Sequence, residues 1–300
     1  MTMTAGTTVS LEVAREVSPY GYFVTDGYQD VLLHYTEIVG SVKIGDKPDV
    51  FLYYDTEDRL AATMRKPLLQ LGQTALLQVA DLHPRFGAFL DMGLGRQLLL
   101  PYKEQPELKE LRPQVGDSVY AVMTHDKQGR LIARLAGEPE LADMVFHAPT
   151  SWKNEWRSAR VYKSLQVGTF AVVDGGVLGF GALGMVHATE RVGLPRVGEE
   201  IKVRIAFIRE DGRVNLSMRQ PKHVSQGADA DVIMDYLRER PNQSMPYSDA
   251  TPSDIITSKF HMSKGAFKRA LGKLMKEGLI EQKENWTYLK QQDGESNDPA

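Results

Sequence analysis

Pairs of aromatic residues recur around a glycine in the first half of the chain. The pairs are Tyr20 with Phe23 and Phe86 with Phe89, and a weaker copy has Val167 with Phe170. Rings exposed on a strand can stack on unpaired bases, which contributes about 1–3 kcal/mol per base whatever the base sequence. The glycine between each pair allows a kink, so that both rings can face the same side of the strand. The alternative is that one or both rings of each pair belong to the core.

Histidine and arginine recur beside these rings. His34 and His187 each follow a short apolar segment and share the context His-x-Thr-Glu. An imidazole there could stack on a base or bond a phosphate, although a lone histidine is more often a satisfied polar residue. Three predicted hairpin turns carry Arg59, Arg130 and Arg213, whose guanidinium groups suit phosphate contacts.

The elements that would position these residues repeat three times. Each copy has alternating strand-like residues, the glycine-centred element, an apolar strand, a Gly-acid turn and the arginine hairpin. A unit of about 60–70 residues with short alternating runs is typical of a small β-barrel. Five strands in each unit predict an OB-fold, which closes its sheet.

The C-terminal part changes from strand to helix spacing. Apolar residues within 230–240 have helical periodicity, and Ser263 can cap a further helix that ends at Gly278. The segments 279–280 and 286–289 can then form a two-stranded wing. The second helix presents Lys264, Lys268, Arg269 and Lys273 opposite its apolar stripe. We interpret these cations as a recognition face for nucleic acid; the alternative is an ordinary solvated helix face.

The predicted fold is therefore multidomain and mainly β, with three OB barrels in tandem before an α+β winged helix-turn-helix domain. A polar break is expected over 222–227. The predicted boundaries are barrel 1 at 1–68, barrel 2 at 69–138, a partly helical linker at 139–155, barrel 3 at 156–221, the winged helix at 228–290 and a disordered tail at 291–300.

Composition argues against several other classes of protein. The chain has no cysteine, which excludes disulfides and cysteine-ligated metal sites, and its seven histidines lack metal-ligand spacing. The glycine-rich segment 179–184 precedes a predicted strand, so it does not indicate a dinucleotide site. We expect no cofactor, no metal, no enzymatic activity and no membrane segment, and we predict a cytoplasmic protein.

Charge is unevenly distributed, although the net charge is only −3. Residues 6–67 hold 6 Lys and Arg against 10 Asp and Glu, and residues 72–139 hold 8 against 8. Residues 150–221 hold 11 against 7. Phosphate contacts are therefore expected to be strongest towards the C-terminal half.

The third repeat resembles the RNA-binding domain of ribosomal protein S1. The resemblance lies in the order of His-Ala-Thr-Glu at 187–190, Gly-Glu at 198–199, Asp-Gly-Arg at 211–213 and Leu-Ser at 216–217. In that family an RNA face is formed by two aromatics, a histidine, an aspartate and an arginine. The resemblance implies an RNA face in each barrel. In barrel 1 this face would consist of Tyr20, Phe23, His34, Asp55 and Arg59, and in barrel 2 of Phe86, Phe89, Asp126 and Arg130, with Leu100 in the histidine position. In barrel 3 it would consist of Phe170, His187 and Arg213, with Val167 in place of the first ring and Arg209 in place of the aspartate. We expect barrel 3 to be favoured by charge and barrel 2 by its aromatics.

From about residue 6 to 290 the sequence resembles the bacterial conserved virulence factor B (YitL-like) family. The closest stretches are 154–156, 161–162 and 262–276. The resemblance implies S1-type barrels, a winged helix and RNA binding linked to control of gene expression, with no known catalytic activity. Our leading hypothesis is a non-enzymatic protein that binds single-stranded RNA, most simply mRNA, and regulates expression post-transcriptionally. The winged helix could instead contact DNA or the ribosome. Two alternatives remain: a DNA-binding transcription regulator and a protein-interaction scaffold.

Overall fold

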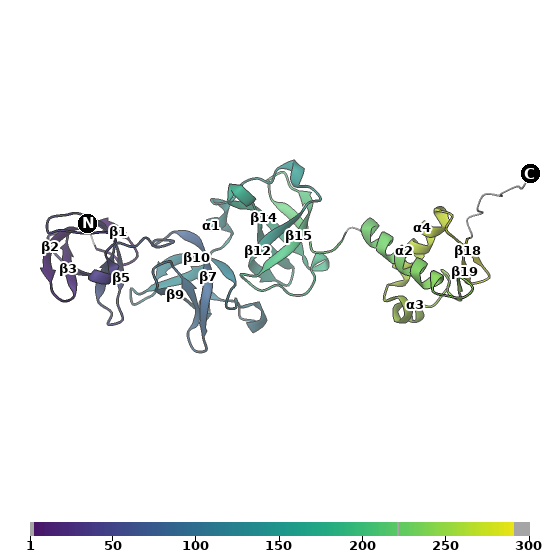
Figure 1. The fold of residues 1–300 in the computed structure, drawn as a ribbon, viewed down its shortest axis with the longest axis horizontal. Coiled ribbons are helices and arrows are strands. Elements are labelled where there is room, and N and C mark those ends of the chain that lie inside the picture. Colours follow the sequence, from purple (N-terminus) through teal and green to yellow (C-terminus); the bar gives the residue numbers. More distant parts are fainter. Residues whose placement is uncertain (1–2, 221, 291–300) are drawn as a thin grey trace, which may run out of the picture. The chain divides into compact units, whose positions relative to one another are not determined.

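The computed structural model describes residues 3–220 and 222–290, and the predicted tail at 291–300 lies outside them. The chain forms two compact units, Met1–Arg219 and Gln220–Ala300 (Figure 1). The first unit contains three β-domains and the second a winged helix. The predicted fold class is confirmed.

Barrel 1 is a six-stranded sheet in the order β1-β5-β6-β4-β3-β2. Its strands are β1 (Thr8–Ser10), β2 (Glu12–Val17), β3 (Gly21–Thr25), β4 (Asp30–His34), β5 (Asp49–Tyr54) and β6 (Leu60–Thr63), and the 3-10 turn η1 (Tyr35–Glu37) follows β4. Only Leu11 separates β1 from β2, and these pair with β5 and β3 respectively. One interrupted strand therefore closes the sheet around a core that includes Val13, Val24, Leu33 and Leu52.

Barrel 2 is a five-stranded sheet in the order β11-β10-β7-β8-β9. Its elements are β7 (Thr74–His83), β8 (Gly87–Asp91), β9 (Gln97–Pro101), η2 (Tyr102–Glu104), η3 (Lys109–Leu111), β10 (Ser118–His125) and β11 (Leu131–Leu135). The edge strands β9 and β11 lie side by side, but no hydrogen-bonded ladder joins them in the described part of the chain. The barrel is thus open at this seam, whereas the sequence predicts closure in every repeat.

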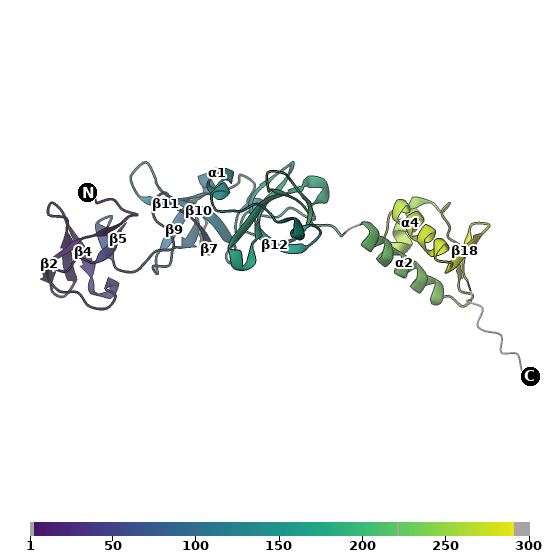
Figure 2. The same cartoon turned by 90° about the horizontal axis from the view of Figure 1, so that it is seen from above.

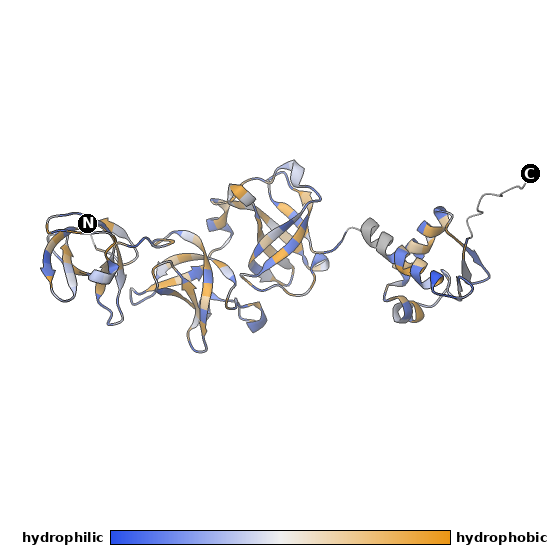
Figure 3. Cartoon of the chain, viewed as in Figure 1, coloured by the Kyte–Doolittle hydropathy of each residue, from blue (hydrophilic) through white to orange (hydrophobic). Residues whose placement is uncertain are grey.

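Barrel 3 is closed, with the strand order β12-β13-β14-β16-β15. Its elements are β12 (Trp156–Leu165), β13 (Gly168–Asp174), η5 (Gly176–Leu178), β14 (Phe180–His187), η6 (Ala188–Glu190), β15 (Glu200–Ile208) and β16 (Val214–Ser217), preceded by α1 (Glu138–Ala142) and η4 (Thr150–Trp152). Figures 1 and 2 show the sheet curling on itself. Hydrophilic and hydrophobic residues alternate along its strands (Figure 3), because side chains point in turn to solvent and core.

Neighbouring barrels of the first unit share specific contacts. At the first junction the Leu71 amide donates to the Gly6 carbonyl at 2.8 Å, and the Arg96 guanidinium lies 4.2 Å from the Tyr53 ring centroid. At the second junction Arg196 forms a two-pronged ion pair with Asp117, with N–O distances of 2.7 and 2.9 Å. These polar contacts, with a cation–π contact at the first junction, add to hydrophobic clusters that join barrel 1 to barrel 2 and barrel 2 to barrel 3.

The second unit has three helices and a small sheet among its described residues. They are α2 (Lys222–Arg238), β17 (Ser244–Met245), α3 (Ser253–Phe260), α4 (Lys264–Lys276), β18 (Ile280–Lys283) and β19 (Trp286–Leu289), with sheet order β17-β19-β18. Helix α2 begins at Lys222, so residues 222–227 are helical and do not form the predicted polar break. Leu237, Phe260 and Phe267 are among the buried core residues. No helix in the described ranges is long and apolar enough to cross a membrane.

Candidate nucleic-acid interface

The recurring glycine is required by a close approach of the neighbouring strand. A Cβ atom would lie 2.2 Å from the Leu33 carbonyl oxygen if added to Gly21, and 2.2 Å from the Leu100 oxygen if added to Gly87. At Gly168 the corresponding distance, to the Val186 oxygen, is 2.4 Å. Because a backbone carbonyl cannot give way as a flexible side chain would, only glycine fits at these three positions.

In barrel 1 the predicted rings lie on the outer side of the sheet. Phe23 pairs with Leu32 across β3 and β4, while its neighbour Val24 points into the core and is fully buried. The Arg15 guanidinium lies 4.6 Å from the Phe23 ring centroid, in cation–π geometry. Tyr20 precedes the strand and is 57% exposed. The face therefore combines an open ring with a second ring beneath a cation.

Barrel 2 also presents an exposed ring on its predicted face. Phe86 is 51% exposed and stacks on the His83 imidazole, with ring centroids 4.4 Å apart and an interplanar angle of 23°. The Arg85 guanidinium lies 5.9 Å from the same ring centroid. Phe89 is half-buried on the outer side of β8, where it pairs with Leu99. The imidazole thus stacks on one side of the Phe86 ring, and a base could stack on the other side.

The His-x-Thr-Glu motif is a helix cap. The Nδ1 atom of His34 accepts a hydrogen bond from the Thr36 amide at 3.3 Å, and His187 caps the Thr189 amide in the same way at 3.3 Å. Since a backbone amide can only donate, Nδ1 is the acceptor and the proton of the neutral ring lies on Nε2. This leaves Nε2–H as a donor for a phosphate or a base carbonyl.

The histidine position in barrel 2 is Pro101, not Leu100 as the sequence predicts. Gly87 pairs with Pro101, just as Gly21 pairs with His34 and Gly168 with His187. Leu100 is one residue earlier and points into the core. The prediction was wrong by one residue, which exchanges the two faces of a strand. Barrel 2 carries its imidazole on β7, at His83.

The two predicted aspartates position the hairpin arginines. Asp126 accepts hydrogen bonds from the Arg130 amide at 2.9 Å and from Arg130 Nε at 2.8 Å, and Asp55 holds Arg59 with the same pattern. Partial burial acts to raise the pKa of Asp126, but hydrogen bonds from Arg130 and the Gln128 amide outweigh it, so that pKa is lowered. A carboxylate held in this way orients the guanidinium and is not itself free to bind a ligand.

The corresponding face of barrel 3 is partly covered by α1. Phe170 is half-buried against a cluster that includes Leu141 of this helix, and Arg213 forms an ion pair with Glu138 at 2.6 Å. Arg209, in the aspartate position, pairs with Asp211 at 3.3 Å. His187 and Val167 remain exposed. This face of barrel 3 therefore offers a ligand less free charge than the composition of the barrel indicates, because its arginine and its ring already have partners within the chain.

In the winged helix the predicted cations lie along α4. The Ser263 hydroxyl caps this helix by accepting from the Ala266 amide at 3.2 Å, and Phe267 and Leu271 are buried. Arg269 is exposed, and Lys264 is half-buried. Lys268 and Lys273 lie 3.9 Å from carboxylate oxygens of Asp249 and Glu277. These loose, exposed pairs leave the cations available to phosphates.

The sequence analysis did not predict four candidate residues. Arg15, His83 and Arg85 contact the predicted rings, and the wing carries an exposed Trp286 that stacks on Tyr288 with centroids 6.4 Å apart. Strict alternation along β2 would place Arg15 on the same side as the buried Val13, but a register shift between these two residues turns Arg15 to the outer face, and the sequence gives no sign of that shift. The wing tryptophan is visible in the sequence only as part of a strand.

Four family models match the chain, domain by domain. An "S1 domain" matches residues 5–65, the "CvfB first S1-like domain" 75–134, the "Virulence regulatory factor CvfB, second domain" 141–220 and the "CvfB-like winged helix domain" 231–289. S1-like and winged-helix domains are nucleic-acid-binding types and are not enzymatic families. The fold and its outer face thus define a multidomain protein of nucleic-acid-binding modules.

Similar proteins extend over nearly the whole chain. The Bacillus subtilis (strain 168) protein named "Uncharacterized protein YitL" is 35% identical over 288 residues, which cover 96% of this chain and 94% of that protein. The "Conserved virulence factor B" of Staphylococcus epidermidis is 34% identical over 255 residues, covering 84% and 83%. A crystal structure of a multidomain protein with nucleic acid binding domains from Streptococcus pneumoniae has a TM-score of 0.62 at 29% identity, covering 95% and 98%. The chain belongs to the conserved virulence factor B family.

Proposed function

We propose that this chain is a cytoplasmic, non-enzymatic protein that binds single-stranded RNA, chiefly mRNA, and thereby regulates gene expression post-transcriptionally. The observation that carries the proposal is the exposed Phe86 ring of barrel 2, stacked on His83 and flanked by Arg85. An unpaired base can stack on the open side of this ring, and the neighbouring guanidinium can contact its phosphate. Base stacking tolerates any sequence, which suits a protein that binds many transcripts.

Barrels 1 and 2 would act together. Each offers a ring, a nearby cation and a hairpin arginine held by an aspartate. Contacts between Arg96 and Tyr53 join the two barrels, so a strand held by one barrel is kept at high effective concentration near the other. Two sites that each bind RNA weakly then give the full chain a higher affinity than either site has alone.

The test is a titration of the full chain with a fluorescein-labelled oligouridylate of about 20 nucleotides, followed by fluorescence anisotropy. Replacing Phe86 and Phe89 together with alanine should raise the Kd by about tenfold or more, since stacking contributes about 1–3 kcal/mol per base. Tyr28→Ala is the matched control, because Tyr28 is an exposed ring at the opposite end of β3 from Tyr20. Circular dichroism melting of each variant checks the fold.

Two results would overturn the proposal. One is a wild-type chain that shows no salt-dependent affinity for the oligonucleotide, as a protein-interaction scaffold would. The other is a folded double variant that binds RNA as well as the Tyr28→Ala control does. A double variant that melts early would place the rings in the core, and Phe86→Ala alone, at the more exposed ring, then decides the question.

The exposed cations of α4 favour a second candidate, a DNA-binding regulator that acts through the winged helix. A parallel titration with duplex DNA distinguishes it. Tighter binding of the duplex than of the single strand, abolished on replacing Lys268 and Arg269 with alanine, would support that function in place of ours.

A further inference from the structure

Each barrel repeats one further surface, formed where its first strand pairs with its fourth. In register, the pairs are Thr8 with Phe51 in barrel 1, Thr74 with Val122 in barrel 2 and Trp156 with Arg204 in barrel 3. Each second member lies at the same distance along the chain after its Gly-acid turn. This surface is separate from the glycine-centred faces, which are built on the second and third strands.

In barrels 1 and 2 this surface is apolar and packs on the next barrel. Phe51 is 1% exposed and belongs to the hydrophobic cluster of barrel 2. Val122 is 4% exposed and, with Tyr120, belongs to a cluster that includes Val172 and Leu183 of barrel 3. In the first unit, then, this position of the repeat holds successive barrels together.

In barrel 3 the same surface is charged and exposed, whereas in barrels 1 and 2 it is apolar and buried. Barrel 3 is the last barrel of the first unit, and its surface carries two exposed rings: Trp156 is 41% and Phe207 54% exposed. Arg204 and Lys202 stand where barrel 2 has Val122 and Tyr120. We call the outward side chains of this strand pair the β12–β15 face; they are Trp156, Ser158, Arg160, Glu200, Lys202, Arg204 and Phe207.

The charge on the β12–β15 face is not balanced internally. Arg160 pairs with Glu200 at 2.7 Å. Lys202, in contrast, donates to the neutral Ser158 hydroxyl at 2.7 Å, and Arg204 donates to the Asn154 amide oxygen at 3.2 Å. Within residues 3–220 and 222–290, neither of these two cations forms an ion pair. Two cations without an ion-pair partner, beside two open rings, match the composition of single-strand binding surfaces.

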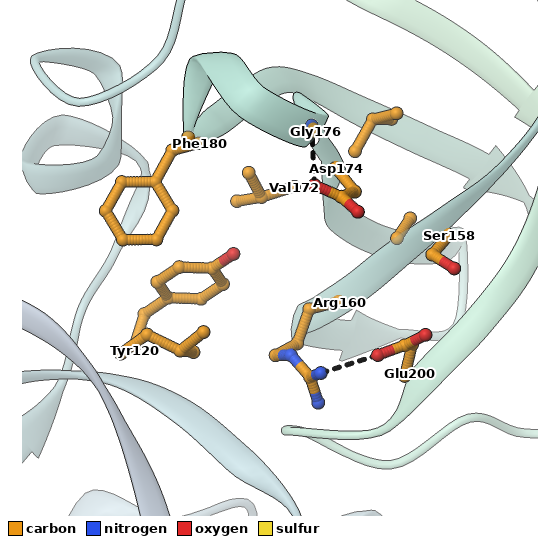
Figure 4. A pocket seen from close by; sticks show the side chains of 12 residues that line it. Tyr120, Ser158, Arg160, Val172, Asp174, Gly176, Phe180 and Glu200 are labelled. Carbon is orange, nitrogen blue, oxygen red and sulfur yellow. Dashed lines mark hydrogen bonds and ion pairs between the residues drawn. The ribbon is translucent and has the colours of Figure 1, made fainter.

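The face continues into a cavity between barrels 2 and 3. Ser158 and Arg160 belong to both, and the cavity has a volume of about 380 Å³. Figure 4 shows the rings of Tyr120 and Phe180 together on one side, with the Arg160–Glu200 pair and Ser158 on the other. The two rings meet edge to face with centroids 5.5 Å apart. Small-molecule sites are commonly apolar clefts of about 300–1,000 Å³ with a few polar groups, which is the character of this cavity.

We propose that the β12–β15 face is an additional binding site for single-stranded nucleic acid. Lys202 and Arg204 hold the backbone phosphates, Trp156 and Phe207 stack on bases, and a further base enters the cavity against Phe180. The inference rests on the proposed function and adds to it a surface outside the S1-type faces. It also gives barrel 3 a ligand site, although α1 covers part of its glycine-centred face.

Charge argues against the other occupants of this face. A symmetric dimer would bring two such faces together, with their cations opposed. The protein contacts that this surface makes in barrels 1 and 2 are mainly apolar, whereas nucleic acid supplies both anions and rings.

The test compares the full chain with the double variant Trp156→Ala, Lys202→Glu, again by anisotropy with the labelled oligouridylate over a salt series. The variant should raise the Kd about fivefold or more. The slope of log affinity against log salt should become shallower by about 0.7 for each phosphate that the variant no longer neutralises. Lys43→Glu makes the same charge change at an exposed site of barrel 1 and should change the Kd less than about twofold.

A second measurement does not depend on how well the variant folds. Oligouridylate containing 4-thiouridine is photo-crosslinked to the wild-type chain, and the modified peptides are identified by mass spectrometry. Crosslinks at Trp156, Phe180 or Phe207 support the site. Crosslinks confined to the glycine-centred faces and the winged helix would overturn it.

The outcomes separate the inference from the proposed function. If the wild-type chain binds RNA and the folded double variant binds it equally well, the β12–β15 face is not a site and the proposed function stands. If the wild-type chain binds no RNA, both fail. If the variant instead changes the sedimentation coefficient of the wild-type chain by altering self-association, the face joins protein copies and the inference is wrong.

Discussion

Barrels 2 and 3 present the same glycine-centred face to different partners. In barrel 2 the first ring, Phe86, is open to solvent and stacks on His83. In barrel 3 the ring that remains, Phe170, packs towards Leu141 of α1, and Arg213 is paired with Glu138 of the same helix. One face is ready for a ligand, and the other is partly used inside the chain.

This difference shows that repetition of a fold does not preserve the use of a surface. The close approach that requires glycine is present in all three barrels, since it belongs to the strand geometry. The partner of the ring depends instead on the segment that joins barrel 2 to barrel 3, which contains a five-residue helix. Packing and binding compete for the same apolar rings, and the short helix α1 decides between them in barrel 3.

The largest effect should come from removing the second ring of each of these faces in turn. Phe170→Ala removes a half-buried ring that packs within the chain, so it should lower the free energy of unfolding by about 1–3 kcal/mol, less than the loss of a fully buried ring, and change RNA affinity little. Phe89→Ala, at the matching position of barrel 2, should weaken RNA binding about fivefold or more and cost less stability. Urea unfolding and anisotropy titrations of both variants measure the two effects. Equal losses of stability and of RNA affinity in the two variants would show that the two faces do not differ in use.

A smaller effect should follow from releasing Arg213. Glu138→Gln keeps the size of the side chain but removes the carboxylate that lies 2.6 Å from the guanidinium. Arg213 then retains the longer ion pair to Asp211, at 3.7 Å. We expect RNA affinity to rise about two- to threefold at low salt, because the less tightly held cation can contact a phosphate, and the gain should disappear at high salt. Glu107→Gln, at an exposed site of barrel 2, removes the same charge and serves as the control. An equal gain in both variants would mean that only net charge matters.

The sequence predicted the repeated architecture better than the use of each face. Alternation, the recurring glycines and the hairpin turns sufficed for three barrels and a winged helix, because these signals are local. Placing Leu100 in the histidine position was an error of one residue, since an apolar run does not reveal which residue ends the strand. The Glu138–Arg213 pair joins distant parts of the chain, and the β12–β15 face depends on which surfaces the barrels bury against one another. Neither leaves a local pattern in the sequence.

The smallest effect should come from the hairpin carboxylates, which barrel 2 has and barrel 3 has replaced with Arg209. Asp126→Asn removes the charged partner of Arg130 and should weaken RNA binding by about twofold, as the guanidinium loses its fixed direction. Anisotropy titration of the variant against wild type measures this change.

The same carboxylate should make stability depend on pH. Partial burial acts to raise the pKa of Asp126, but hydrogen bonds from Arg130 outweigh that effect, so the pKa is lowered in the folded chain. Its contribution to stability is therefore present above the ordinary aspartate pKa of about 3.9 and is lost as the pH falls through the lower, folded value. The thermal midpoint of wild type should exceed that of Asp126→Asn at neutral pH, and the gap should close in acid; the exposed Asp143→Asn should show no such gap. A gap that persists unchanged at the acid end would mean that the carboxylate does not hold Arg130 through its charge, and the hairpins of barrels 2 and 3 would then be equivalent.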